Sequence, residues 1–273
     1  MYRNNHTRRS YPAAKKRRIA KWPFAAALCA GLVILAGVYF WSAKHHETST
    51  PSSASGTNNS NSQSSTAQQP AAGFDKHKYS NDDPTSPWVV VDKQRPLQPK
   101  TYAPADLKVP DIAANGNEQL NATTADALKS MVASAQTQGV NLGLASGYRS
   151  YQTQVSVYAS EVKSVGQAQA DRESARPGYS EHQSGWAADL SAVNGKCRLQ
   201  QCFADTPEGT WLAANAYKHG FVIRYPQGKE TITGYEYEPW HVRYVGVELA
   251  TEMHKQGVST LEEFFGLPAA PSY

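Results

Sequence analysis

The sequence predicts an α+β domain, formed by residues 85–273, behind an amino-terminal anchor and a polar linker. Segments typical of strands and helices mix here without the regular strand–helix–strand order of a parallel α/β sheet. The length of this region suits one domain with one hydrophobic core. An uncharged apolar run and a polar low-complexity segment separate it from the amino terminus.

Basic residues are concentrated at the amino terminus. The first 43 residues hold eight of the 27 Lys and Arg residues and no Asp or Glu, which leaves 19 basic against 23 acidic residues in the remainder. A nucleic-acid-binding domain concentrates cationic charge on its own surface. The predicted domain lacks that charge balance, and we therefore exclude nucleic acid as a partner.

Residues 22–43 form an uncharged, mostly apolar run that predicts a transmembrane anchor. A helix of this length crosses a hydrocarbon core of ~30 Å, and aromatic residues lie near both of its ends. The basic tail, residues 1–21, precedes the run, so we expect a cytoplasmic amino terminus and an extracellular domain at the cell membrane. A cleaved signal peptide is the alternative, although the run is long for one and no clean small-x-small site follows it.

Residues 44–84 are dominated by Ser, Thr, Asn, Gln, Ala and Pro. Such a segment buries too little apolar surface to offset its chain entropy, so it predicts a disordered tether. Beyond it, Cys197 and Cys202 lie close together in the part expected outside the cell, where an oxidising environment allows a small disulfide loop. A zinc knuckle is disfavoured because no second Cys or His pair accompanies them.

The first half of the domain contains two predicted strands and two predicted helices. Residues 88–91 are a short apolar run typical of a buried strand. A helix with an apolar face follows, because Leu128, Met131, Val132 and Ala135 recur at helical spacing, with Thr123 and Asp126 as a candidate cap and Gly139 as its end. A strand over 142–146 and a helix over 151–165 come next.

The second half predicts three strands and three helices. The strands are 187–191, 221–224 and 240–244, and the helices are 207–218, 247–255 and 260–265. Pro207 suits the first turn of its helix and Gly220 suits the stop after it.

Two histidines and one aspartate form a candidate metal site. Catalytic zinc usually takes three ligands from His, Asp or Glu and leaves one position for water. His182, Asp189 and His241 make such a set, and Glu238 lies three residues before the last of them, where it can accept a proton from water. From spacing alone, a hydrogen-bonded structural role for these histidines stays open.

Three motifs follow one another along the domain, and each combines chemistry-bearing residues with glycine or aromatic residues. They are Ser146-Gly-Tyr-Arg149-Ser-Tyr-x-x-Gln154, Pro177-Gly-Tyr-Ser-Glu-His182-x-x-Gly185-x-Ala-x-Asp189 and Glu238-x-x-His241. In this order they resemble the signature of the VanY-type D,D-carboxypeptidases, zinc peptidases that share a fold with D-alanyl-D-alanine dipeptidases and the Hedgehog signalling domain. The resemblance covers residues 88–267 and implies a small antiparallel sheet flanked by helices.

The same resemblance implies roles for individual residues. His182, Asp189 and His241 would bind zinc, with Glu238 as the catalytic base and Arg149 beside the scissile carbonyl. The pocket would be lined by Gln154 and Ser180. Tyr148 and Trp240 are further candidates for its walls, although each equally suits the ordinary core. Glu181, next to a ligand, is either a hydrogen-bond partner of the metal site or a surface acid.

The resemblance also frames the function. It implies a carboxypeptidase that removes the terminal D-alanine from the peptide stems of peptidoglycan. Removal from a D-Ala-D-Ala terminus is the favoured specificity, and an L,D-carboxypeptidase acting on tetrapeptide stems is the alternative. A cell-wall-binding module that has lost catalysis is disfavoured, because every residue of the expected catalytic set is present. No obligate protein partner is evident.

Overall fold

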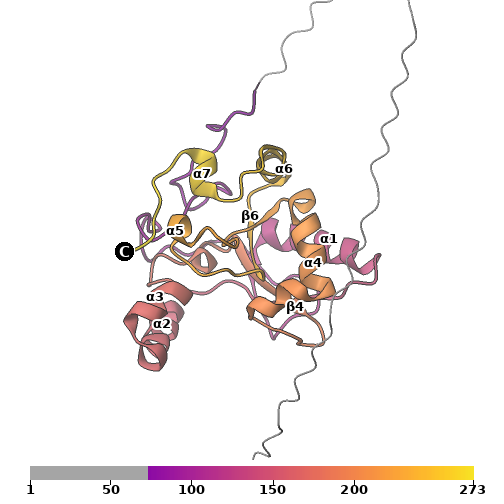
Figure 1. Cartoon of the computed structure of the whole chain (residues 1–273), viewed down its shortest axis with the longest axis horizontal. Helices are drawn as coiled ribbons and strands as arrows, with labels where there is room; N and C mark the ends of the chain where they lie inside the picture. Colours follow the sequence, from indigo (N-terminus) through magenta and orange to yellow (C-terminus); the bar gives the residue numbers. More distant parts are fainter. Residues whose placement is uncertain (1–72) are drawn as a thin grey trace, which may run out of the picture. The chain divides into compact units, whose positions relative to one another are not determined.

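A four-stranded antiparallel sheet forms the centre of the computed structural model, which describes residues 73–273 (Figure 1). Its strands are β3 (Leu142–Ser146), β4 (Ala187–Ala192), β5 (Phe221–Ile223) and β6 (His241–Tyr244). They lie in the order β3-β4-β6-β5. The antiparallel sheet expected from the sequence is therefore confirmed. A separate pair of two-residue strands joins β1 (Leu107–Lys108) to β2 (Leu120–Asn121).

Helix α1 (Ala122–Gln136) and helix α4 (Pro207–Asn215) cover one face of this sheet with the main hydrophobic core. The predicted apolar stripe of α1 is buried, as the 3.6-residue period requires. Its amino terminus is capped by Asn121, whose side chain accepts from the Thr123 N–H, in place of the predicted Thr123 cap. Asn is a strong N-cap because its short side chain reaches the free N–H groups of the first turn.

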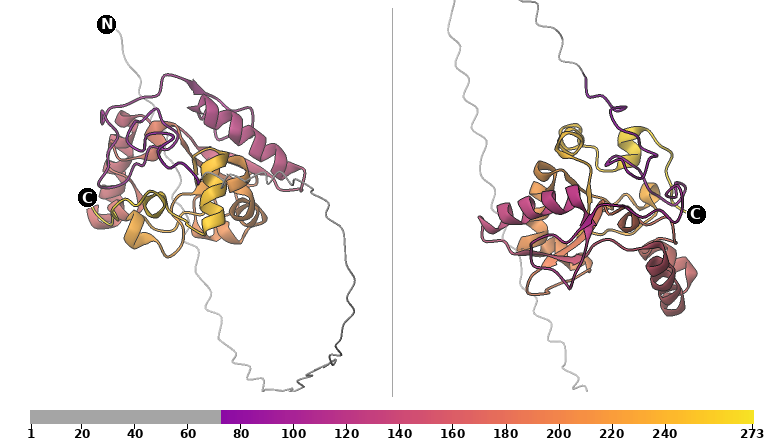
Figure 2. Two further views of the ribbon diagram at one scale, coloured as in Figure 1. Left: turned by 90° about the horizontal axis from the view of Figure 1, so that it is seen from above. Right: turned by 180° about the vertical axis from the view of Figure 1, so that it is seen from behind.

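The remaining helices surround the sheet edges. They are α2 (Tyr151–Val165), α3 (Gln167–Glu173), α5 (Glu230–Thr233), α6 (Val247–Gln256), α7 (Leu261–Phe265) and the 3₁₀ turns η1 (Glu181–Ser184), η2 (Gln201–Asp205) and η3 (Ala216–His219). Figures 1 and 2 show α2 and α3 side by side at one edge of the domain, away from α1 and α4.

The segment 88–91, predicted as a strand, is buried as expected but pairs with no strand of either sheet. The segment is buried and extended, and Trp88 and Val90 pack into one apolar cluster while Val89 and Val91 pack into another. It does not belong to either sheet. Its carbonyl groups instead accept from two buried arginines, since Arg243 donates to Val89 and Arg224 donates to Val91. Side chains thus satisfy backbone groups that a neighbouring strand would otherwise bond.

The predicted tail (1–21) and anchor (22–43) lie outside the described residues, as does most of the predicted linker (44–84). Where that linker is described, it is already part of the domain. The Phe74 ring stacks on Trp88 with centroids 5.5 Å apart, and the Val90 N–H donates to the Asn81 carbonyl. The domain therefore begins ahead of the predicted boundary, because an aromatic side chain in this polar segment finds an apolar cluster. Within residues 73–273, no helix combines the length and apolarity needed to span a bilayer.

Candidate metal centre

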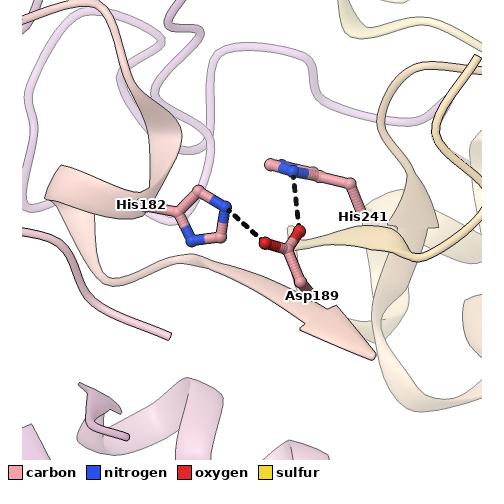
Figure 3. A group of neighbouring side chains, drawn as sticks. All are labelled: His182, Asp189 and His241. Carbon is pink, nitrogen blue, oxygen red and sulfur yellow. Dashed lines mark ion pairs between the residues drawn. The ribbon is translucent and has the colours of Figure 1, made fainter. Parts of the chain in front are cut away.

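Strand register brings the candidate ligands together on the face of the sheet opposite the main core. Asp189 of β4 pairs directly with His241 of β6. Because side chains alternate along a strand, Ala188 and Val242 point into the core while Asp189 and His241 point to the other face. His182 comes from η1, immediately ahead of β4, and all three side chains converge (Figure 3).

The three side chains meet at atomic distances that suit a shared ion. Asp189 Oδ2 lies 3.2 Å from His182 Nε2, and Asp189 Oδ1 lies 3.2 Å from His241 Nδ1. One ligand atom from each residue lies within 4.8 Å of the others, and all three residues are buried. Asp189 Oδ1 finds no hydrogen-bond partner among the described residues despite this proximity. An unpaired buried carboxylate oxygen is costly, and a bound cation removes that cost.

Charge and tautomer also fit zinc. Burial raises the pKa of the Asp189 carboxyl, but the adjacent His182 and His241 outweigh burial and hold that pKa well below its ordinary value. His182 Nδ1 lies 2.7 Å from the Gly147 carbonyl, so Nδ1–H donates there and Nε2 keeps its lone pair. His241 Nε2 lies 3.4 Å from Glu181, which leaves Nδ1 for the metal. Two imidazoles, each with a hydrogen-bond partner behind it, and one carboxylate match a catalytic zinc site.

Glu181 is the partner of the site rather than a surface acid. Its side chain is fully buried, and Oε1 accepts from Arg224 Nε at 2.8 Å and from Arg243 Nη1 at 2.7 Å. Burial alone raises the pKa of Glu181, but these two guanidinium groups hold it well below its ordinary value. Arg224 also binds Glu262 of α7 through both of its terminal nitrogens. Two acids and two arginines thus form a charge-balanced group beneath His241.

Glu238 lies beside the cluster, at the wall of a cavity of about 560 Å³ that also contains the three candidate ligands. Its Oε2 is 3.4 Å from His241 Nδ1. Burial raises the pKa of the Glu238 carboxyl above its ordinary value. The loop ahead of β6 fixes its position, since the Glu238 N–H donates to the Tyr225 carbonyl and its own carbonyl accepts from the His241 N–H.

The other predicted site residues divide into two groups. Arg149, Ser180 and Trp240 line the cavity, whereas Gln154 and Tyr148 are not among its lining residues. Gln154 is fully buried and acts behind Arg149: its Oε1 accepts from Arg149 Nη1 at 3.1 Å, while its Nε2 donates to the Ala175 carbonyl at 2.6 Å.

Sequence reasoning missed part of the cavity wall. Leu199, Gln200 and Gln201 line it and lie inside a ring closed by a Cys197–Cys202 disulfide. The two cysteines predicted this ring, but nothing in their spacing indicated that it faces the site. Tyr225, Tyr235 and Tyr237 also line the cavity and carried no motif.

Comparison with known proteins agrees with this geometry. A family model described as D-alanyl-D-alanine carboxypeptidase, VanY, matches residues 117–247. The solved structure of LdcB, an LD-carboxypeptidase, is 42% identical, with a TM-score of 0.63, covering 67% of this chain and 87% of that one. The chain belongs to the VanY family.

Two further proteins are similar to this chain. A mutant of the vancomycin-resistance D,D-pentapeptidase VanY, solved in complex with Zn(II), is 31% identical with a TM-score of 0.55, covering 66% of this chain and 98% of that one. The putative carboxypeptidase YodJ of Bacillus subtilis is 43% identical over 182 residues. That match covers 65% of this chain and 66% of YodJ, just under two thirds of its length.

Proposed function

We propose that this chain is a zinc-dependent carboxypeptidase that removes the C-terminal D-alanine from peptidoglycan stem peptides ending in D-Ala-D-Ala. The observation that carries the proposal is the convergence of His182, Asp189 and His241 within 4.8 Å, beside the buried carboxyl group of Glu238. Membership of the VanY family supports the substrate class, and the zinc complex of a VanY enzyme supports the metal.

Glu238 supplies the proton transfers that amide hydrolysis requires. Zn²⁺ held by His182, Asp189 and His241 would lower the pKa of a water molecule and polarise the scissile carbonyl. Glu238 accepts the proton that the attacking water loses and then delivers it to the leaving amine. Its raised pKa suits both roles, because a general acid–base works best with a pKa near the working pH, and the ordinary pKa of a carboxyl group lies well below neutral.

Arg149 stabilises the negative charge that develops on the carbonyl oxygen. It is always charged, and it lines the same cavity as the metal cluster. Ser146 and Gln154 fix its guanidinium group, since Nη2 donates to Ser146 Oγ at 3.2 Å and Nη1 to Gln154. Gln154 therefore positions Arg149, while Ser180 and Trp240 provide walls of the substrate cavity.

A second specificity has its own support. LdcB, an LD-carboxypeptidase, is 42% identical to this chain, against 31% for the D,D-pentapeptidase VanY. An L,D-carboxypeptidase would remove D-alanine from a tetrapeptide stem, and the two activities would use the same metal centre.

Mass spectrometry of purified muropeptides separates these alternatives. Incubation with the protein is expected to convert pentapeptide stems into tetrapeptide stems, with activity lost to a chelator and restored by zinc. Conversion of tetrapeptide into tripeptide stems alone would establish the L,D specificity instead. No cleavage of either stem by the zinc-loaded protein would reject a carboxypeptidase and favour a binding module.

The proposal includes a location. The apolar run at residues 22–43 and the basic tail before it favour a single-pass membrane protein whose catalytic domain faces the wall. The lipid bilayer and the stem peptides are then its partners. The full chain is expected in the membrane fraction, and a chain lacking residues 1–43 in the soluble fraction; equal partitioning of the two would contradict the anchor.

A further inference from the structure

The loop closed by the Cys197–Cys202 disulfide faces the substrate cavity with three consecutive residues, Leu199, Gln200 and Gln201. It connects the end of β4 to α4, so it is not part of the sheet that carries the metal ligands. It is nevertheless on the same cavity of about 560 Å³ as His182, Asp189 and His241.

The backbone of this loop is held in an unfavourable conformation. Cys197 and Leu199 have φ angles of 53° and 51°, and they are the only non-glycine residues with positive φ in residues 73–273. Such conformations cost about 1–3 kcal/mol each and persist only where the surroundings impose them. Backbone strain of this kind is frequent at ligand-binding sites, so this loop is a candidate for a role in binding.

Several contacts impose that conformation. The disulfide joins the two ends of the ring, and Arg198 Nη2 donates to the Ala145 carbonyl of β3 at 3.0 Å. Phe203, directly after the ring, is fully buried in the main core. The ring is therefore fixed at both ends and at Arg198, with Leu199, Gln200 and Gln201 lining the cavity.

The tip presents an apolar side chain to solvent. Leu199 is 41% exposed, and on α2 the side chain of Val157 is 37% exposed. Both residues line the cavity. Exposed large aliphatic side chains at the wall of a cleft are a site for apolar contact with a ligand. A single alanine is small against a cavity of about 560 Å³, so the cavity has room for the peptide ahead of the scissile bond.

We propose that the Cys197–Cys202 loop is a substrate-recognition element, in which Leu199 packs on the aliphatic part of the stem peptide ahead of the scissile bond. The disulfide positions Leu199 for that contact. This inference rests on the proposed carboxypeptidase function and extends it to the residues that select long stems over short peptides.

The test compares two substrates that share one scissile bond. One is a complete peptidoglycan stem peptide, and the other is an acylated dipeptide with only the two residues flanking that bond. Leu199→Ala is expected to lower kcat/KM for the complete stem about tenfold, mainly through KM. Turnover of the short peptide and the bound zinc are expected to stay unchanged, and Leu199→Met is expected to restore recognition of the stem.

Two further variants complete the design. Val109 is 45% exposed, comparable to Leu199, and is not among the cavity-lining residues. Val109→Ala is therefore expected to leave kcat/KM unchanged for both substrates. The double variant Cys197→Ser with Cys202→Ser is expected to reproduce the rise in KM for the stem.

The outcomes for Leu199→Ala decide the inference. An equal loss of kcat/KM on both substrates, or no loss on either, would overturn the inference but leave the proposed carboxypeptidase function intact. Wild-type protein that cleaves neither peptide would overturn the proposed function itself, and the inference with it.

Discussion

The floor and the wall of the cavity are built differently. On the floor, His182, Asp189 and His241 are at most 5% exposed, and Glu181 with its two arginines is buried behind them. On the wall, Leu199 and Val157 are about two fifths exposed and come from a loop and an edge helix. The floor depends on strand register and on paired charges, whereas the wall depends on elements outside the sheet. We therefore expect substitutions on the wall to change specificity without disturbing the metal cluster on the floor.

The floor is sensitive to single changes because its charges compensate one another. Arg224 and Arg243 both bind Glu181, and Glu262 completes the group. Removing one member of a buried ion group leaves an uncompensated charge in the interior, which costs about 3–5 kcal/mol. Leu199 and Val157 on the wall are uncharged and partly exposed, so we expect changes there to alter substrate binding more than folding.

The largest effect is expected at Glu238. In Glu238→Gln the side chain keeps its size but can no longer accept a proton, so kcat should fall by about 10²–10⁴. Zinc content, measured by mass spectrometry or a metal assay, should stay at the wild-type level because Glu238 is not one of the three ligands. A variant that cleaves stem peptide at the normal rate would show that the base is another residue.

A smaller effect is expected from substitution of Arg224, which tests whether the floor contributes more to folding stability than the wall does. Arg224→Met should lower the free energy of unfolding by about 3–5 kcal/mol, because Glu181 and Glu262 are then buried without their shared partner. Denaturant unfolding of the zinc-loaded protein measures this change. An unchanged unfolding midpoint would contradict the view that the floor is held by this charge group.

The matched control is an exposed ion pair. Lys129 lies 2.9 Å from Asp111, and both side chains are largely in solvent. Exposed pairs are screened by water and contribute little, so Lys129→Met should leave the unfolding midpoint and the activity unchanged. A loss in this variant comparable to that in Arg224→Met would mean that burial is not what distinguishes the two pairs.

Local sequence patterns predicted much of the fold. The apolar spacing of Leu128, Met131, Val132 and Ala135 predicted α1, and the predicted strand 142–146 and helix 151–165 coincide with β3 and α2. These signals reside in residues a few positions apart, which is why one sequence suffices to detect them. The convergence of His182, Asp189 and His241 was also predicted, because the motifs that contain them resemble a known family.

Other features depended on residues that are distant in the chain. The segment 88–91 has the composition of a strand, yet it stays outside the sheet because Arg224 and Arg243 take its carbonyl groups. The role of Glu181 required the same two arginines to fold beneath His241.

By itself, then, the sequence determined the α+β class, most helices and strands, and the candidate metal ligands with their neighbouring base. Only the tertiary structure decided that Glu181 supports His241, that Gln154 holds Arg149, and that the Cys197–Cys202 loop faces the cavity. The physical reason is that periodicity and capping act between neighbouring residues. A buried charge group or a cavity wall exists only once residues dozens of positions apart have packed together.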